Sequence, residues 1–220
     1  FMQRLEAEAT MDEIAINPEL DELLDRQLDQ SKFIAWRDGK TGWPFFDACV
    51  RSLTATGWIN FRMRAMLQSV ASYTLWLPWQ VTGAHLANLF MDYEPGIHWS
   101  QVQMQSGVTG INSVRAYSVS KQSTDHDPDG DFIRRWVPEL GAVPAKYIHQ
   151  PWLMSKAEQQ QYNCQIDLDY PAPIVDEKAA RKTGISMSYK AKGDAGVRRR
   201  AKIVFDIHGS RSRQSGKGRK

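Results

Sequence analysis

The chain has 220 residues, of which 42% are hydrophobic and 24% charged, an ordinary composition for a soluble globular protein with a sizeable core. Two cysteines far apart in the sequence and five histidines without metal-ligand spacing argue against a disulfide framework and predict no metal site. Neither an apolar run of transmembrane length nor a signal-peptide pattern occurs, so we expect no membrane partner and a cytoplasmic location.

The first part of the chain is predicted to contain helices and one loop. Residues 1–15 have the pattern of the end of a helix. A second, charged helix is predicted over residues 17–30, because Asn17 can cap it and Pro18 is favoured at the first helical position. Two glycines and a proline then predict a loop over residues 38–44.

Apolar residues at helical spacing continue through the centre of the chain. They predict a helix over residues 45–56, closed by Gly57, and a longer helix over residues 58–77. Pro78 interrupts the pattern, which resumes over residues 79–91.

Residues 92–125 differ from the centre, since Gly, Ser, Asn and Gln are frequent and no helical period is sustained. The pattern predicts a long ordered loop with short turns. A loop of that length inside a compact domain usually has a function.

The last part of the chain is punctuated by proline and glycine. A turn is predicted over residues 127–130 and a break in helical structure near Gly193. Helices are predicted over residues 131–137, 144–148, 155–161 and 176–207. With no alternating strand pattern, the predicted fold is mainly α, with one domain over residues 1–207 and a basic, disordered tail over residues 208–220.

The net charge of +3 is unevenly distributed along the chain. Residues 190–220 contain eleven Lys and Arg against two Asp, whereas the remaining residues have a net negative charge. Clustered Lys and Arg suit phosphate backbones, which favours a nucleic-acid partner. A solvated, disordered terminus is the alternative interpretation.

Five segments, each weak alone, resemble in one order the signature motifs of the photolyase/cryptochrome family. They span roughly residues 30–180, and their occurrence in series makes the resemblance specific. The segments are 36–44 (WRDGKTGWP) followed by 47–51 (DACVR), 56–64 (TGWINFRMR), Trp79 with Asp92 and Glu94, 127–140 (DPDGDFIRRWVPEL), and 170–176 (YPAPIVD).

The resemblance implies a helical FAD-binding domain of photolyase/cryptochrome type, with FAD as the cofactor. In the family, an α/β antenna domain precedes this domain, and a phosphate-binding segment also lies upstream. We therefore expect an N-terminally truncated domain, with the antenna domain present in the full-length protein. The resemblance also leads us to expect a monomer and UV-damaged DNA as a partner.

Arg64 and Asp92 match an Arg and an Asp that pair beside the flavin in the family. An Arg fork fits a carboxylate bidentately, and a guanidinium near the ring favours an anionic flavin. Glu94 takes the place of a family Asp and keeps the carboxylate. An ordinary buried Arg–Asp ion pair is the alternative interpretation of the first two residues.

His98 matches the residue that faces the flavin N5 atom in the family. A histidine can donate, accept or carry charge near neutral pH, so it is a candidate catalytic residue that sets which flavin redox state is stable. A loop histidine with satisfied hydrogen bonds is the alternative. The other residues expected at the cofactor are Asn60, Phe61 and Val102, of which Phe61 replaces a family Asn.

The resemblance also implies an electron relay and a DNA-binding pocket, both altered here. Val102 and Arg26 replace two relay tryptophans, which leaves Trp79 as the second candidate catalytic residue. Met104 stands where repairing members stack a Trp on the lesion, and a Met can still pack against a flipped base. The residues expected at the DNA are Arg62, Met104 and Arg115. Alternative relay positions are Trp58, Trp76, Trp99 and Tyr93.

Three functions are compatible with these residues. The first is a lyase of deoxyribodipyrimidine photolyase type, which repairs UV lesions in DNA by electron transfer from light-excited reduced flavin. The second is a cryptochrome-like blue-light receptor without repair activity, which the replaced tryptophans favour. The third is a fragment that cannot bind FAD alone.

Overall fold

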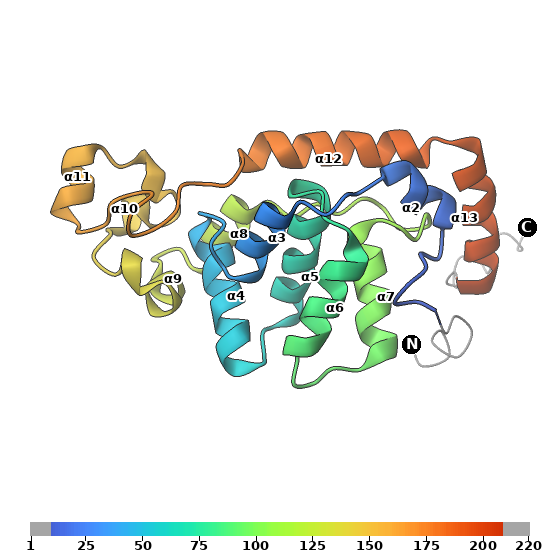
Figure 1. Ribbon diagram of the computed structural model, residues 1–220, viewed down its shortest axis with the longest axis horizontal. Coiled ribbons are helices and arrows are strands. Elements are labelled where there is room, and N and C mark those ends of the chain that lie inside the picture. The colour runs from blue at the N-terminus through green and yellow to red at the C-terminus, as the bar shows by residue number, and fades with distance from the viewer. Residues whose placement is uncertain (1–9, 209–220) are drawn as a thin grey trace, which may run out of the picture.

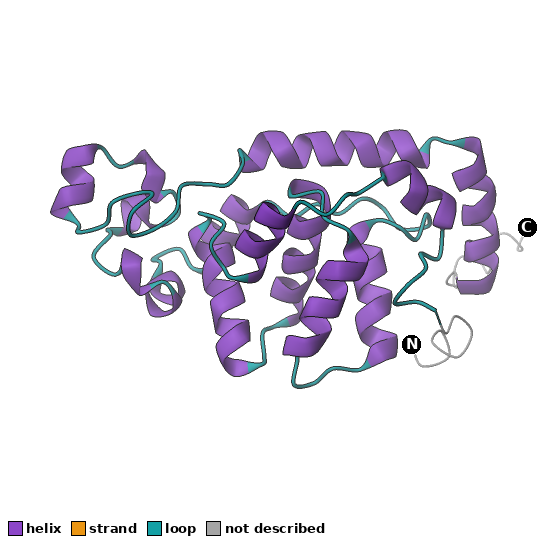
Figure 2. Cartoon of the chain, viewed as in Figure 1, coloured by secondary structure: helices purple, strands orange, loops and turns teal. Residues whose placement is uncertain are grey.

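The computed structural model of the protein describes residues 10–208. Its regular elements are helices throughout this part of the chain, and the one β-type contact is an isolated bridge between Ile166 and Tyr170 (Figure 2). The predicted mainly α fold is confirmed. The predicted basic tail over residues 208–220 lies outside the described residues apart from His208, which is the last residue of a helix.

Four helices, α4 to α7, lie side by side at the centre of the molecule (Figure 1). The long α12 crosses one edge of this group, α9 to α11 form one end, and α13 forms the other. The α-helices are α2 (Pro18–Leu24), α3 (Gln30–Arg37), α4 (Pro44–Thr56), α5 (Phe61–Ser69), α6 (Trp79–Leu89), α7 (Pro95–Ser106), α8 (Val119–His126), α9 (Asp131–Trp136), α10 (Ala145–Ile148), α11 (Lys156–Gln161), α12 (Glu177–Lys192) and α13 (Ala195–His208), with a π-helical turn at Val70–Thr74 and 3₁₀ turns at Pro138–Leu140 and Pro151–Leu153.

Several helix ends are where the sequence predicts them. The Asn17 side chain accepts a hydrogen bond from the Leu20 backbone N–H and begins α2, with Pro18 at its first position. Gly57 ends α4 in the left-handed conformation, with φ of 70°. The predicted break near Gly193 separates α12 from α13.

The prediction of a long loop over residues 92–125 is wrong, because α7 and α8 lie within it. Glu94 caps α7 by accepting hydrogen bonds from two backbone N–H groups, and Gly107 ends it. The helix has no apolar stripe because its buried faces carry polar side chains. Gln103, for example, is fully buried and binds the backbone at Met11, Ile14 and Ile16.

The segment near the N-terminus that Gln103 binds also differs from its predicted helical structure. The predicted helix over residues 1–15 ends in turns over its described part, and Ile14 is 52% exposed whereas Met11 is buried. The backbone here makes a single turn, with the Ile14 N–H donating to the Thr10 carbonyl, and the Gln103 side chain then binds the carbonyls of Met11 and Ile14. The predicted helix over residues 17–30 is also shorter, because Asp25 adopts a left-handed conformation directly after α2.

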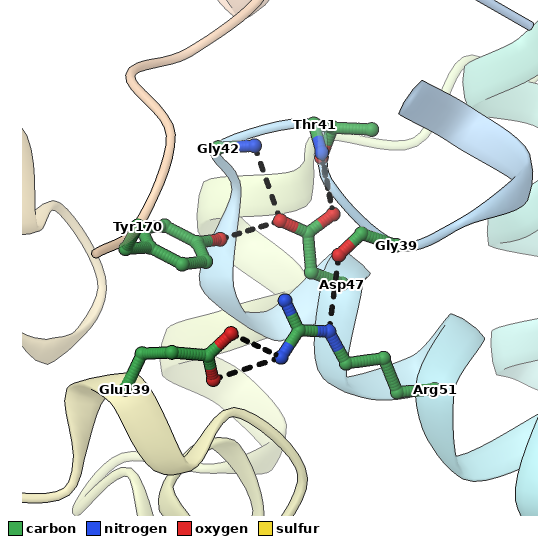
Figure 3. Close-up of polar contacts among 7 residues, drawn as sticks. All are labelled: Gly39, Thr41, Gly42, Asp47, Arg51, Glu139 and Tyr170. Carbon is green, nitrogen blue, oxygen red and sulfur yellow. Dashed lines mark hydrogen bonds and ion pairs between the residues drawn. The ribbon is translucent and has the colours of Figure 1, made fainter. Parts of the chain in front are cut away.

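Asp47, in the first turn of α4, joins three parts of the chain (Figure 3). Its buried carboxylate accepts hydrogen bonds from the backbone and hydroxyl of Thr41 at 2.9 and 2.6 Å, from the Gly42 backbone at 3.1 Å, and from the Tyr170 hydroxyl at 2.5 Å. Burial raises the pKa of Asp47 to about 6, although the hydrogen bonds from Thr41 and Tyr170 act in the opposite direction. The donors around the carboxylate favour its ionised form, against the effect of burial.

Arg51, one turn further along α4, extends this connection (Figure 3). Its Nη1 donates to both carboxylate oxygens of Glu139, at 2.8 and 2.9 Å, and its Nε donates to the Gly39 carbonyl at 3.1 Å. The contacts of Asp47 and Arg51 join three of the segments that resemble family motifs in the sequence, namely 36–44 with 47–51, 127–140 and 170–176. In this structure the three segments hold one another in place, so their role is to stabilise the fold.

Replacing Asp47 by Asn is expected to lower the free energy of unfolding by about 3 kcal/mol, because an amide nitrogen would then face buried donors. Tyr170→Phe removes one donor only and is expected to cost about 1–2 kcal/mol. Urea denaturation at neutral pH measures both. Asp131→Asn is the control, since that side chain is 90% exposed; an Asp47→Asn change no larger than the control would contradict the interpretation.

Candidate functional site

A cavity of about 690 Å³, with its open mouth included, lies among α5, α6 and α7. Helical spacing places its walls, because the lining residues recur every three or four positions along α5 and α7. They are Phe61, Arg64, Ala65, Gln68, Leu86, Phe90, Asp92, Tyr93, Glu94, Ile97, His98, Gln101, Val102 and Gln105.

Arg64 and Asp92 form a bidentate ion pair at the cavity wall. The two guanidinium nitrogens donate to the two carboxylate oxygens at 2.9 Å each, and Nε donates to the Ile59 carbonyl at 2.7 Å. The guanidinium carbon also lies 4.4 Å from the centre of the Phe90 ring. The hydrogen bond from Arg64 lowers the pKa of Asp92. The guanidinium is thus held rigidly and presents a positive charge to the cavity.

His98 is 8% exposed, and its Nε2 lies 2.9 Å from the Gly83 carbonyl oxygen. A carbonyl only accepts, so Nε2 carries the proton. Burial lowers the pKa of His98, the hydrogen bond to Gly83 opposes this, and the charge of Arg64 lowers it further. The neutral ring therefore has a bare Nδ1, which can accept a hydrogen bond from a ligand.

Gly83 allows the close approach of α6 and α7 that makes this hydrogen bond. A Cβ atom at this position would lie 2.6 Å from the Trp99 ring and 2.9 Å from Val102 Cγ1. Both distances are below ordinary van der Waals contact. A larger residue at 83 would push α7 away and move His98 relative to the cavity.

Three glutamines in the cavity wall have unused acceptors. The side-chain oxygens of Gln68, Gln101 and Gln105 are buried and have no hydrogen-bond partner within the described part of the chain. Buried polar atoms without partners are rare in folded proteins, and they are expected where a ligand completes the structure. A ligand that carries hydroxyl or amine donors would provide the partners that these oxygens lack.

Of the four other residues expected at the cofactor, three line the cavity and one lies outside it. Phe61 and Glu94 line the cavity, and Val102 lines it while being 3% exposed. Glu94 uses its carboxylate to cap α7. Asn60 caps α5 and lies outside this cavity, in the wall of a neighbouring one.

The residues expected at the DNA do not line the cavity. Arg62 is exposed at the start of α5, and Met104 is half-buried on α7. Arg115 is exposed, and its backbone carbonyl accepts a hydrogen bond from Ser69 at 3.0 Å. The structure therefore places these three side chains outside the cavity wall.

Trp79 is fully buried and also lies outside the cavity wall. Its indole N–H donates to Asp21 Oδ2 at 3.1 Å, and its ring meets that of Trp99 edge to face, with 6.2 Å between centroids. Trp99 donates in turn to the Tyr93 hydroxyl at 3.1 Å, and Tyr93 lines the cavity. Aromatic side chains thus connect Trp79 to the cavity through Trp99 and Tyr93.

Sequence reasoning missed the three glutamines. Gln68 lies one helical turn after Arg64 on α5, so that position could have been inferred. Gln101 and Gln105 share a face of α7 with His98, but that pattern has meaning only once the segment is recognised as a helix.

The described residues form an all-helical domain with an amphiphilic cavity between three of its helices. No described helix is long and apolar enough to cross a membrane. Residues 1–190 match the family model of the FAD-binding domain of DNA photolyase. The chain therefore belongs to the photolyase/cryptochrome family and represents its FAD-binding domain.

The relatives that resemble the chain include a cryptochrome and a photolyase. The chain is 37% identical over 153 residues to a cryptochrome DASH of Natronomonas pharaonis, and the aligned region covers 70% of this chain and 32% of that protein. It is 36% identical over 168 residues to a deoxyribodipyrimidine photo-lyase of Alkalihalophilus pseudofirmus, with 76% and 34% covered. The chain thus spans about a third of the length of these relatives.

Solved structures show the same likeness. A class III photolyase from Agrobacterium tumefaciens superposes with a TM-score of 0.76 at 27% identity, covering 86% of this chain and 40% of that one. A cryptochrome from Synechocystis superposes with a TM-score of 0.70 at 34% identity, covering 73% and 34%. The fold is therefore shared with a photolyase and a cryptochrome.

His98 is expected to titrate below the ordinary histidine value of about 6.5. Because its pKa is lowered in the fold, the unfolded chain takes up the proton first, and this group destabilises the fold as the pH falls through 6.5. An NMR titration of the His98 ring measures the midpoint directly. Arg64→Gln removes the nearby charge and is expected to raise the midpoint; a midpoint above 6.5 in the unaltered protein would contradict the burial argument.

Proposed function

We propose that the cavity binds FAD and that the chain acts in light-driven repair of UV lesions in DNA. The observation that carries the proposal is the cavity wall itself, which is formed by a fixed guanidinium and by three glutamines whose side-chain oxygens have no partner within the described chain. Family membership supports the cofactor. The bound flavin would supply the electron-transfer chemistry, while the protein supplies placement and charge.

The wall residues have distinct roles in this proposal. Arg64 places a positive charge beside the isoalloxazine ring, with Asp92 holding its orientation. Neutral His98 offers an acceptor through Nδ1 and thereby favours flavin forms that carry a donor at the facing position. Phe61, Glu94 and Val102 complete the wall, and Asn60 holds the start of α5 in place.

Trp79, Trp99 and Tyr93 are proposed as the route by which electrons reach the cavity. Their contacts are continuous, and they begin at Asp21, whose carboxylate accepts from the Trp79 indole. This route bypasses Val102, the aliphatic residue where the family resemblance leads us to expect a tryptophan.

UV-damaged DNA is the proposed substrate. Arg62 and Arg115 are exposed cations, and Phe61 is 61% exposed at the cavity, so bases and phosphates would find both stacking and charge. The full-length protein is proposed to act as a monomer with a preceding α/β antenna domain.

A blue-light receptor without repair activity is the second candidate. The observation that favours it is the aliphatic character of α7 at Val102 and Met104, which offers no aromatic surface on which a lesion could stack. Both candidates need FAD in the same cavity, so only an assay with damaged DNA separates them.

Arg64→Ala is expected to weaken FAD binding at least tenfold, because it removes the cavity's fixed charge and leaves Asp92 unpaired. Flavin absorption after FAD addition and gel filtration measures retention. Arg62→Ala is the matched control, two positions away on α5 and exposed. Absence of flavin binding by the unaltered chain would contradict cofactor binding by this part of the protein.

Illumination of the FAD-loaded chain with UV-damaged DNA is expected to reduce the lesion content, measured by chromatography of the digested DNA. Dark incubation is the control. Unchanged lesion levels in a chain that retains and photoreduces flavin would reject repair and favour the receptor.

A further inference from the structure

A second cavity of about 930 Å³, with its mouth included, lies beside the first and shares no lining residue with it. It is bounded by one face of α4, the segment 58–60 that leads into α5, the end of α8, and α9. Segment 58–60 lines the second cavity, and the next residue, Phe61, lines the first.

Aromatic rings form much of the second cavity. Trp58 is 56% exposed, so its indole face is open to a ligand. Phe132 and Trp136 line the cavity from α9, and the Phe132 ring lies 5.9 Å from that of Phe45 on α4 and 6.5 Å from that of Trp136. Such walls accept a flat ring, because aromatic surfaces gain most from stacking with another π-system.

Charge in the second cavity is positive. Among its lining residues there is no Asp or Glu, while Arg135 and His126 both contribute. Within the described chain, Arg135 has no ion pair, and its guanidinium carbon lies 5.5 Å from the Trp136 ring. Its neighbour Arg134 is bound instead to Asp131 and to two backbone carbonyls. Arg135 is therefore the cation of α9 that is available to a ligand.

We propose that the second cavity binds a nucleotide, with the base stacked among Trp58, Phe132 and Trp136 and the phosphate on Arg135. A base has a planar π-face that suits the walls, and a guanidinium is the side chain best shaped for phosphate. An uncharged aromatic ligand would leave Arg135 without a role. The site takes either a free nucleotide or an unpaired base of single-stranded DNA, which share this chemistry.

The inference goes beyond the flavin cavity and requires neither flavin nor light. Isothermal titration of the chain with deoxyadenosine monophosphate, and separately with deoxyadenosine, tests it. Trp58→Ala is expected to weaken binding of both at least fivefold, because one stacking wall is lost. Arg135→Gln is expected to weaken the monophosphate about threefold to tenfold and to leave the nucleoside unchanged.

Two matched controls separate this site from the general effects of exposed rings and exposed cations. Tyr189→Ala removes a similarly exposed ring from α12, and Arg198→Gln removes an exposed cation from α13. Both are expected to leave nucleotide binding unchanged. Circular dichroism confirms folding of each variant, and Trp58→Phe, which keeps a ring, is expected to retain most of the affinity.

Absence of nucleotide binding at millimolar concentration would overturn the proposal. So would equal losses in Tyr189→Ala and Trp58→Ala, or an Arg135→Gln loss that is the same for nucleoside and nucleotide. Titration with a ten-residue oligothymidylate distinguishes the two sources. Tighter binding of the oligonucleotide, with the same dependence on Trp58 and Arg135, identifies an unpaired base of a strand, whereas tighter binding of the mononucleotide identifies a free nucleotide.

Discussion

Asp47 has a fully buried carboxylate at the start of α4, where it accepts hydrogen bonds from the loop before it and from Tyr170, 123 positions later. A buried charge without these donors would be costly, so the segments that provide them must come together as the chain folds. Arg51 brings Glu139 into the same arrangement. The helix α4 packs on α5, and α5 forms part of the cavity wall. The hydrogen bonds of Asp47 therefore also support that wall.

The candidate cavity combines rigid positioning with unsatisfied polar groups. Arg64 is fixed by Asp92 and Ile59, and His98 is fixed by the close approach of α6 and α7 at Gly83. The side-chain oxygens of the three glutamines, by contrast, have no partners among residues 10–208, which is a cost to the fold that a ligand can offset. Preorganised charge together with unused acceptors is what a tightly held, polar cofactor requires.

The helices of the centre and the ordered motifs could be predicted from the sequence, because apolar spacing and capping residues report local structure. The helix α7 could not. Its buried faces carry Gln103, Ser106 and His98, whose partners are backbone and side-chain groups far along the chain. Hydropathy does not reveal polar groups that are satisfied only in the fold. The pair of Arg64 and Asp92 was accessible through family resemblance alone, since 28 positions separate the two residues.

By itself, the sequence determined the mainly α class, the ends of several helices, and the chemical character of the residues that face the candidate cavity, because these follow from local spacing and residue type. The tertiary structure alone decided which of those residues meet. It assigned Asp47 to holding the fold, Arg64 and His98 to one wall, and Trp58 and Arg135 to a second cavity. The physical reason is that burial and hydrogen bonding between distant segments are properties of the packed chain, and local sequence does not encode which partners they join.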